Sequence, residues 1–357
     1  MMLVRSRAAL SSLQRTAPAL PAWNRRGVKM ATFSDPNFDF KGYLDNRPRY
    51  PDILYNKILA FHRGGHGAVL DLGCGPGLSV FPLSAHFDRI IGTDPSEGMI
   101  REAQGAWSAW KQTQRDSPHL AQIERTKAEF SVDSAEELRT VQDASVDLVV
   151  AATAAHWFDM DKVWPQLSRV LRPKGTVAFW CYGANYLPAH PSLLAPMCEF
   201  MCSQSAKMGP YWPQPGRAIN ENLLLDIAFP TRGDGAAEAV WDTSSATRVT
   251  HKLVKPGLAD IAWTRGEAPE ETFRMEHVKS FDSLNGYFHS SSAAMRYLNK
   301  HPELKVEKPD MIDRHVDTLR ADILAQRRDD PRTNKEGLDD DHVRMAWPLG
   351  LMMVRKR

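Results

Sequence analysis

Short apolar segments alternate with longer amphipathic segments through the first half of the chain. The apolar segments are rich in Val and Ile, and they are Ala68–Leu72, Arg89–Thr93, Ala128–Val132, Val146–Ala151 and Thr176–Cys181. Segments of helical composition, such as Glu97–Lys111 and Val163–Leu171, lie between them. Apolar strands separated by helices predict a doubly wound α/β fold, in which a mostly parallel sheet is covered by helices on both faces.

This alternation ends near Gly183. Prolines recur from Pro188 to Pro215, and no strand–helix repeat returns before His301. Prolines at this density interrupt both helices and central strands. We therefore predict that residues 184–301 form a cap inserted into the core.

The chain regains a regular pattern after the cap. Pro309–Arg328 has apolar residues at helical spacing, and Val343–Val354 suits a last strand with Pro348 at an edge or a bulge. The predicted organisation is an extension over 1–34, a core over 35–183, the cap over 184–301, and a helix and strand over 302–357 that complete the core.

Composition narrows the function classes. The chain has 357 residues, of which 43% are hydrophobic and 25% charged, and its formal net charge is only +2. This balance, without a basic stripe, predicts no nucleic-acid partner, and the lack of an apolar run of about 18 residues predicts no membrane span. Four scattered cysteines without zinc-site spacing favour reduced thiols in an intracellular compartment and no bound metal.

The first 34 residues differ from the rest of the chain. They contain six basic residues and no acidic residue, which is the composition of a mitochondrial presequence. The alternatives are a disordered tail and a later start at Met30. We expect a cytoplasmic protein, with a mitochondrial location as the alternative that this segment raises.

A glycine-rich loop follows the first predicted strand. In the sequence Val-Leu-Asp-Leu-Gly-Cys-Gly-Pro-Gly of residues 69–77, the acid is Asp71 and glycine occupies every second position of the loop. Glycine lets the backbone turn sharply and approach a ligand, and a helix N-terminus after the loop would point its N–H groups at that ligand. A dinucleotide-binding loop would need a third glycine where Leu78 stands. Asp71 would repel a pyrophosphate but suits the cationic amino-acid end of S-adenosylmethionine; the alternative is a tight turn without a ligand.

A second acid, Asp94, ends the second predicted strand. It lies roughly 20 residues past the glycine loop, where a carboxylate can accept both hydroxyls of a ribose. Nicotinamide enzymes share this feature, so it indicates a nucleoside without identifying it. The alternative is that Asp94-Pro95 only forms a turn.

These motifs, together with four further segments, resemble the class I S-adenosylmethionine-dependent methyltransferase superfamily. The further segments are Tyr43–Pro51, Asp94–Met99, Ser134–Glu136 and Ala155–Asp159. About 40% of the chain, from Tyr43 to Gly183, is most similar to the small-molecule branch that includes the trans-aconitate methyltransferases of fungi and bacteria. The resemblance implies a Rossmann-like seven-stranded sheet, S-adenosylmethionine as the cofactor and a small-molecule substrate.

The resemblance also implies roles for individual residues. Asp133, Ser134 and Ala135 would border the adenine, with Ser134 where the family often has an acid. His156, after the fourth predicted strand, would hold the substrate or take a proton, unless it is a core histidine. Arg47 would clamp a substrate carboxylate, unless it is a solvated surface residue, and Tyr43 would face the sulfonium. The predicted cofactor site consists of Asp71, Gly73, Gly75, Gly77, Asp94, Asp133, Ser134 and Ala135, and the predicted catalytic residues are Tyr43, Arg47 and His156.

We expect methyl transfer to a carboxylate oxygen of a small organic acid or a related metabolite. A carboxylate is already ionised at neutral pH and needs no base, whereas a hydroxyl needs one, and His156 is then the candidate. One alternative is a hydroxyl O-methyltransferase of natural-product biosynthesis. Another is a cofactor-binding protein that catalyses nothing, and a nicotinamide oxidoreductase is disfavoured by Leu78.

Overall fold

The computed structural model describes residues 46–203, 208–230, 240–251, 272–305, 308–334 and 337–357. The predicted extension over 1–34 and the predicted catalytic residue Tyr43 lie outside these residues. Their roles therefore stay predictions.

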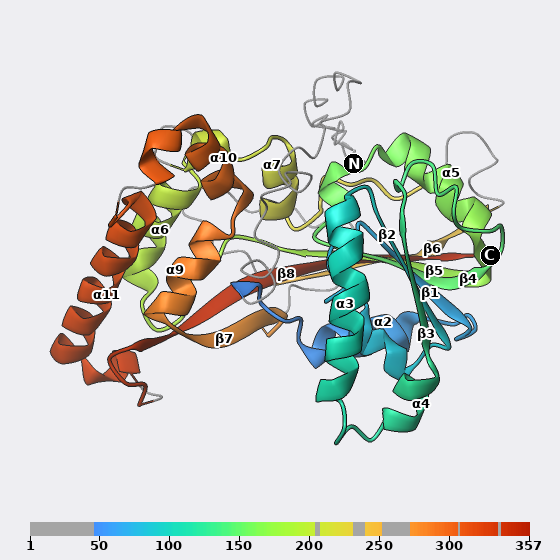
Figure 1. The fold of residues 1–357 in the computed structure, drawn as a ribbon, viewed down its shortest axis with the longest axis horizontal. Helices are drawn as coiled ribbons and strands as arrows, with labels where there is room; N and C mark the ends of the chain where they lie inside the picture. The colour runs from blue at the N-terminus through green and yellow to red at the C-terminus, as the bar shows by residue number, and fades with distance from the viewer. Residues whose placement is uncertain (1–45, 204–207, 231–239, 252–271, 306–307, 335–336) are drawn as a thin grey trace, which may run out of the picture. The chain divides into compact units, whose positions relative to one another are not determined.

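A mostly parallel sheet forms the centre of the described chain (Figure 1). Its strands follow the order β3-β2-β1-β4-β5-β8-β6, and β7 pairs with β8 outside this path. The strands are β1 (Ala68–Leu72), β2 (Arg89–Asp94), β3 (Lys127–Val132), β4 (Val146–Ala152), β5 (Leu171–Tyr182), β6 (Trp241–Thr250), β7 (Arg274–Ser280) and β8 (His342–Lys356). The strands β1 to β5 are parallel, and β8 runs antiparallel to its neighbours β5 and β6. The predicted α/β sheet is confirmed, and β7 adds an eighth strand to the seven that were expected.

Successive side chains of the central strands alternate between two hydrophobic clusters. In β1, Val69 belongs to one hydrophobic cluster and its neighbour Leu70 to another. Likewise Trp180 of β5 lies in the first cluster and Phe179 in the second. Because successive side chains of a strand point to opposite faces, both faces of the sheet carry a core. This is the reason that the parallel strands read as continuous apolar runs in the sequence.

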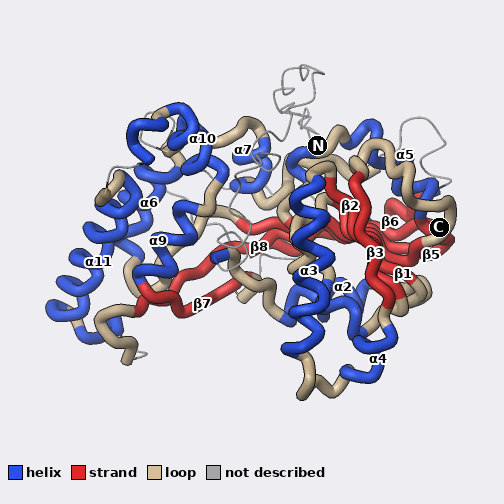
Figure 2. Tube along the Cα trace, viewed as in Figure 1, coloured by secondary structure: helices blue, strands red, loops and turns tan. Residues whose placement is uncertain are grey.

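Helices cover the sheet and form a second group beside β7 (Figure 2). Those nearest the parallel strands are α2 (Asp52–Phe61), α3 (Glu97–Thr113), α4 (Leu120–Arg125) and α5 (Met160–Val170). The others are α6 (Leu194–Met201), α7 (Gly216–Glu221), α9 (Phe281–His289), α10 (Ser292–Lys300) and α11 (Met311–Asp329). Short 3₁₀ helices are η1 (Phe81–Ala85), η2 (Ala155–Trp157), η3 (Pro191–Leu193), η4 (Gly209–Tyr211), η5 (Pro302–Lys305) and η6 (Pro331–Asn334).

The long strand β8 connects the sheet to the second helical group. Its first half pairs with β7 and its second half with β5 and β6. Pro348 lies where these partners change, and its carbonyl accepts the N–H of Gly183 at 2.9 Å. Because proline has no N–H to donate to a ladder, the change of partners is the place in β8 that tolerates it.

The range predicted as a cap also contributes to the main sheet. β6 lies within residues 184–301 and pairs with β8. Its sequence, Trp-Asp-Thr-Ser-Ser-Ala-Thr-Arg-Val-Thr, has few apolar residues, because it lies at the end of the strand order. The hydrophobic pattern therefore did not reveal it.

A buried carboxylate ties the start of β1 to β4 and β5. Asp147 of β4 is 3% exposed and accepts the N–H of Ala68 at 2.9 Å and Nη1 of Arg172 at 2.7 Å. Removing it leaves the buried N–H of Ala68 without an acceptor. A buried N–H without an acceptor destabilises the folded state by more than a solvent-exposed ion pair stabilises it.

We predict that Asp147→Ala lowers the free energy of unfolding by about 2 kcal/mol. Asp143→Ala is the matched control, because Asp143 pairs with Arg169 at 2.6 Å but its side chain is 75% exposed; its cost should stay below about 1 kcal/mol. Urea denaturation followed by circular dichroism measures both. Equal losses for the two variants would show that the Asp147 contacts contribute no more than a surface pair.

Candidate active site

The glycine loop after β1 adopts a backbone that suits glycine. Gly73, Gly75 and Gly77 have φ values of +61°, +52° and +86°. A Cβ at Gly73 would also come within 2.9 Å of the Ala154 Cβ beyond β4. A Cβ at Gly75 would have the Met99 Sδ as its nearest neighbour, at 3.9 Å. The loop therefore passes close to the end of β4 at Gly73, whereas at Gly75 the Met99 Sδ is the one described atom outside the adjacent residues within 4 Å of the Cβ position.

Asp94 holds this loop in place. Its Oδ2 accepts the N–H of Gly75 at 3.0 Å and its Oδ1 accepts the N–H of Ser96 at 2.9 Å. Asp94 is 4% exposed, and burial raises the pKa of its carboxyl while the two backbone N–H groups oppose that rise. Each carboxylate oxygen can accept further hydrogen bonds, so the predicted ribose contact is compatible with these two.

The element after the loop differs from the expected helix. Residues 81–85 form η1, a 3₁₀ helix of five residues with Pro82 in its first turn. Proline is tolerated in a first turn but removes an N–H, and a short 3₁₀ helix carries little of the dipole expected of a long helix. The helix expected after the loop is therefore this short 3₁₀ helix, and the contact between its N–H groups and a ligand stays a prediction.

Asp71 is a buried carboxylate at the end of β1. Its Oδ2 accepts the hydroxyl of Ser79 at 2.7 Å, while Oδ1 has no hydrogen-bond partner among the described residues. Burial raises the pKa of Asp71 to about 7, and the charge of Asp94 acts in the same direction. An orphaned buried oxygen is costly, and an ammonium group from a ligand would satisfy it.

The third predicted segment of the cofactor site is the turn after β3, and the Asp133 carboxylate accepts hydrogen bonds within this turn. Asp133 Oδ1 accepts the N–H of Ser134 at 2.9 Å, and Oδ2 accepts the N–H and the hydroxyl of Thr140, both at 2.8 Å. These contacts use Asp133 to close the turn after β3. The adenine contact predicted for Asp133, Ser134 and Ala135 stays a prediction. Backbone groups of this segment, or Asp133 Oδ1, which accepts a single one of these bonds, would make it.

His156 lies in η2, beyond the end of β4. Burial, followed by the charge of Arg217, lowers the pKa of His156 to about 3. Its Nδ1 is buried and has no partner in the described part of the chain. A Cβ on Gly216 would come within 2.7 Å of the His156 ring, so α7 packs directly on this histidine. The imidazole is therefore neutral at pH 7 and a weak base.

Arg217 is a partly buried residue that sequence reasoning missed. It lies in α7, its Nε donates to Glu221 Oε1 at 2.7 Å, and its guanidinium lies 4.2 Å from the ring centroid of Trp212. The segment around it has no regular pattern in the sequence, so nothing there indicates an arginine beside His156. Only the packing of α7 on η2 reveals it.

Arg47 lies at the carboxyl ends of the sheet strands. Its Nη1 donates to the Tyr182 hydroxyl at 2.7 Å, at the end of β5, and its Nη2 donates to the Ser290 carbonyl at 3.0 Å, after α9. Three residues further on, the Tyr50 hydroxyl hydrogen-bonds the Thr153 hydroxyl beyond β4 at 2.9 Å. The segment that carries Arg47 thus spans the ends of β4 and β5.

Two other features of the described chain do not belong to this site. His289, Asp310 and Asp313 come together, but the Lys308 ammonium contacts both carboxylates, at 3.1 and 3.0 Å, and Asp310 caps α11. The absence of a metal stays a prediction. No helix among the described residues is long and apolar enough to cross a membrane.

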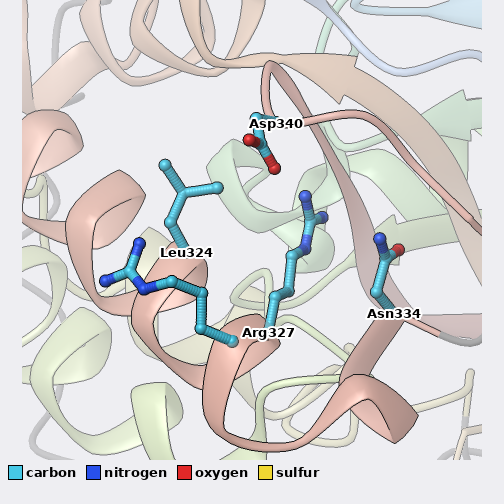
Figure 3. Close-up of a pocket in the computed structure, with 5 residues that line it drawn as sticks. Leu324, Arg327, Asn334 and Asp340 are labelled. Atoms are coloured by element: carbon cyan, nitrogen blue, oxygen red, sulfur yellow. The ribbon is translucent and has the colours of Figure 1, made fainter.

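A surface pocket lies at the end of α11 (Figure 3). Leu324, Arg327, Arg328, Asn334 and Asp340 line it. Arg327 donates to the carbonyls of Asp339 at 2.8 Å and His342 at 2.7 Å, which ties α11 to the loop before β8. These contacts hold α11 against the loop before β8, and none of the residues that line the pocket belongs to the glycine loop.

Comparisons with known proteins agree with this geometry. Residues 70–179 match the family model of a methyltransferase domain. A probable S-adenosylmethionine-dependent methyltransferase of Saccharomyces cerevisiae is 34% identical over 151 residues, which are 42% of this chain and 48% of that protein. A methyltransferase of Claviceps purpurea is 24% identical over 252 residues, or 70% of this chain and 68% of that protein.

The fold likewise matches a solved structure. A candidate type II methyltransferase from Anaeromyxobacter dehalogenans superposes with a TM-score of 0.53 at 22% identity, covering 87% of this chain and 97% of that one. The chain spans about half the length of the first curated relatives it matches, 48% and 47%. Residues 70–179 therefore form a methyltransferase domain with S-adenosylmethionine as the cofactor, and the surrounding fold is that of the solved methyltransferase.

The cofactor's charges fit the residues at the glycine loop. The orphaned Asp71 Oδ1 is an acceptor for the ammonium group, the space beside Gly75 admits a ligand, and Asp94 carries further acceptor capacity for hydroxyls. These residues come from β1, the loop and β2, whose carboxyl ends are adjacent in the sheet. The predicted roles of Asp71, Gly73, Gly75, Gly77 and Asp94 are compatible with this arrangement.

We predict that the affinity for S-adenosylhomocysteine rises as the pH rises from about 5.5 to about 7.5. The pKa of Asp71 is raised to about 7, so the carboxyl is protonated and uncharged at the lower end of this range and attracts the ligand ammonium only when ionised. Isothermal titration calorimetry measures the affinity, with Asp71→Asn as the variant that should bind weakly at every pH. A dependence that persists in Asp71→Asn would rule out Asp71 as its source.

Proposed function

We propose that this protein transfers the methyl group of S-adenosylmethionine to a carboxylate oxygen of a small organic acid, and that Arg47 holds the acid. The observation that carries this proposal is that α7 packs on His156 and buries its Nδ1. The other argument is the position of Arg47. Both concern the edge of the sheet where the strands of such folds bind ligands.

A weak base beside the site favours an acceptor that needs no base. His156 has its pKa lowered to about 3, and general bases are most effective when their pKa lies near the working pH. A hydroxyl acceptor would have to lose a proton to this imidazole. A carboxylate acceptor is ionised at neutral pH and attacks without proton transfer.

A guanidinium at the strand ends favours an acidic substrate. Arg47 is fixed by the Tyr182 hydroxyl and the Ser290 carbonyl, and a guanidinium has five N–H donors. A charged guanidinium at this edge is suited to a charge-assisted contact with a substrate carboxylate. Fixing the arginine in advance reduces the side-chain entropy that a substrate contact would otherwise cost.

The residues of this chain act by positioning. S-Adenosylmethionine supplies a methyl group on a sulfonium, which is electrophilic without further activation. The glycine loop, Asp71 and Asp94 hold the cofactor end of the site, and Arg47 and the packed His156 orient the acceptor end. Holding two reactants in line lowers the barrier without any acid or base.

The resemblance to the trans-aconitate methyltransferase group supports the same substrate class. It rests on the motifs around Arg47 and on His156-Trp157-Phe158-Asp159. The second candidate is a hydroxyl O-methyltransferase. The feature in its favour is His156 itself, which lies beyond β4 with an unpartnered Nδ1 among the described residues.

We predict that turnover is confined to acids in a panel of small molecules. The panel holds di- and tricarboxylic acids, including trans-aconitate, beside phenols and aliphatic alcohols, and the measurement is release of S-adenosylhomocysteine. Turnover with hydroxyl compounds alone would overturn the carboxylate proposal and favour the second candidate.

We predict that Arg47→Ala raises the KM for the acid by about 10- to 100-fold, because it removes charge-assisted hydrogen bonds. The KM for S-adenosylmethionine should change much less. Arg49→Ala is the matched control, because Arg49 is exposed, and its KM values should stay within about twofold. Tyr182→Phe removes one of the contacts that fix the guanidinium and keeps its charge, so it should give an intermediate KM.

Equal increases for the acid and for S-adenosylmethionine in Arg47→Ala would contradict the clamp. They would indicate that the segment at residues 46–50 has lost its position. Steady-state kinetics with each substrate varied in turn separates these two outcomes.

A further inference from the structure

A pair of cysteines lies beside Arg217, next to the candidate active site. Cys198 lies in α6, and Cys202, one helical turn later, is the residue that ends this helix. Arg217 Nη2 lies 2.9 Å from Cys202 Sγ. Both cysteines are free and partly exposed, whereas the other two cysteines of the chain, Cys74 and Cys181, are buried.

The spacing of this pair permits a disulfide. Residues four apart in an α-helix have Cα atoms about 6 Å apart, which lies inside the usual range for disulfides. The backbone of Cys202 has φ −122° and ψ −25°, outside the regular helical values, so its side chain is not held to the direction of a helix interior. The Cys202 N–H still bonds the Cys198 carbonyl at 2.8 Å, which keeps the two residues together.

The surroundings make Cys202 the reactive member. The hydrogen bond from Cys198 and the charge of Arg217 lower the pKa of the Cys202 thiol, and burial opposes them. In contrast, burial raises the pKa of Cys74 and of Cys181. Because the thiolate is the nucleophile, only Cys202 combines access with activation.

The pair is also connected to His156. Arg217 lies in α7, whose Gly216 packs on the His156 ring. A second contact fixes α6 against the same segment, because the Trp212 indole N–H donates to the Met201 carbonyl and the Trp212 ring lies under Arg217. Arg217 therefore connects Cys202 to α7, the helix that packs on η2 beyond the end of β4.

We propose that Cys198 and Cys202 are a peroxide-sensitive dithiol that closes to a disulfide and releases Arg217 from its contact with sulfur. The Cys202 thiolate attacks one oxygen of hydrogen peroxide, the O–O bond breaks, and sulfenic acid and hydroxide form. The Cys198 thiol then attacks the sulfenic sulfur, an S–S bond forms and water leaves. Overall, two thiols are oxidised and one peroxide is reduced to two waters.

The first test measures the modification itself. The full-length protein is treated with hydrogen peroxide and its intact mass is measured, with an expected loss of about 2 Da that dithiothreitol reverses. Peptide mapping should join residue 198 to residue 202 and leave Cys74 and Cys181 reduced. Cys198→Ser should form no such link and should instead give a sulfenic acid at Cys202 that dimedone traps. A disulfide between other cysteines, or no loss of mass, would overturn the proposal.

The second test measures how much Arg217 lowers the pKa of the Cys202 thiol. The rate of iodoacetamide labelling at Cys202 is measured against pH, and its midpoint should lie below the value of about 8.5 for an ordinary thiol. Arg217→Gln should move the midpoint upward, while Arg217→Lys should keep most of the effect. The same midpoint in all three proteins would overturn the role of Arg217.

The third test concerns turnover and rests on the proposed function. Oxidised protein should turn over several-fold more slowly than reduced protein, with recovery in dithiothreitol, and Cys198→Ser should keep its rate under mild peroxide. An unchanged rate in protein shown by mass to carry the disulfide would overturn the link to the site. Absence of turnover in the reduced protein as well would count against the proposed function, because the first two tests do not depend on activity.

Discussion

The two hydrogen bonds that Asp94 accepts are the constraint on which the candidate site depends. They join the N–H of Gly75, in the loop after β1, to the N–H of Ser96, at the start of α3. The loop contains three residues with positive φ, a conformation that it would not hold on local grounds alone. A single buried carboxylate therefore fixes both segments that face the cofactor. Because the Asp94 carboxylate is buried, it would destabilise the folded state without these two N–H donors, and it is stable with them.

The sheet extends this constraint to the acceptor end of the site. Because β1, β2, β4 and β5 are parallel and in register, the segments that follow them emerge at one edge. Asp71, Asp94, His156 and Tyr182 all lie at or beyond those strand ends. Arg47 precedes α2 in the chain, and its guanidinium hydrogen-bonds Tyr182 and Ser290. The second helical group meets the sheet at the same place through β8, which pairs with both β7 and β5.

Burial determines the chemistry available at this edge. It raises the pKa of Asp71 and lowers that of His156, with the charge of Arg217 adding to the second effect. Both shifts favour the uncharged form, as expected for groups removed from water. A site with a neutral imidazole, a carboxyl that titrates near neutrality and a fixed guanidinium is suited to holding charged reactants. It is poorly suited to removing a proton from a hydroxyl.

The sequence by itself determined the parallel part of the fold and the cofactor end of the site. The five apolar runs appear as β1 to β5, because strands buried on both faces must be apolar at every position. The glycine loop and Asp94 could also be predicted, because each depends on consecutive residues. Glycines occupy the positions with positive φ, and an acid ends the strand. Tertiary structure decided the rest. β6 is polar enough to escape the hydrophobic pattern, η1 replaces the helix expected after the loop, and Asp133 is committed to Thr140. Arg217 lies beside His156 because α7 packs on η2, and it contacts Cys202 at the end of α6. Contacts between segments this far apart leave no periodic signal in the chain.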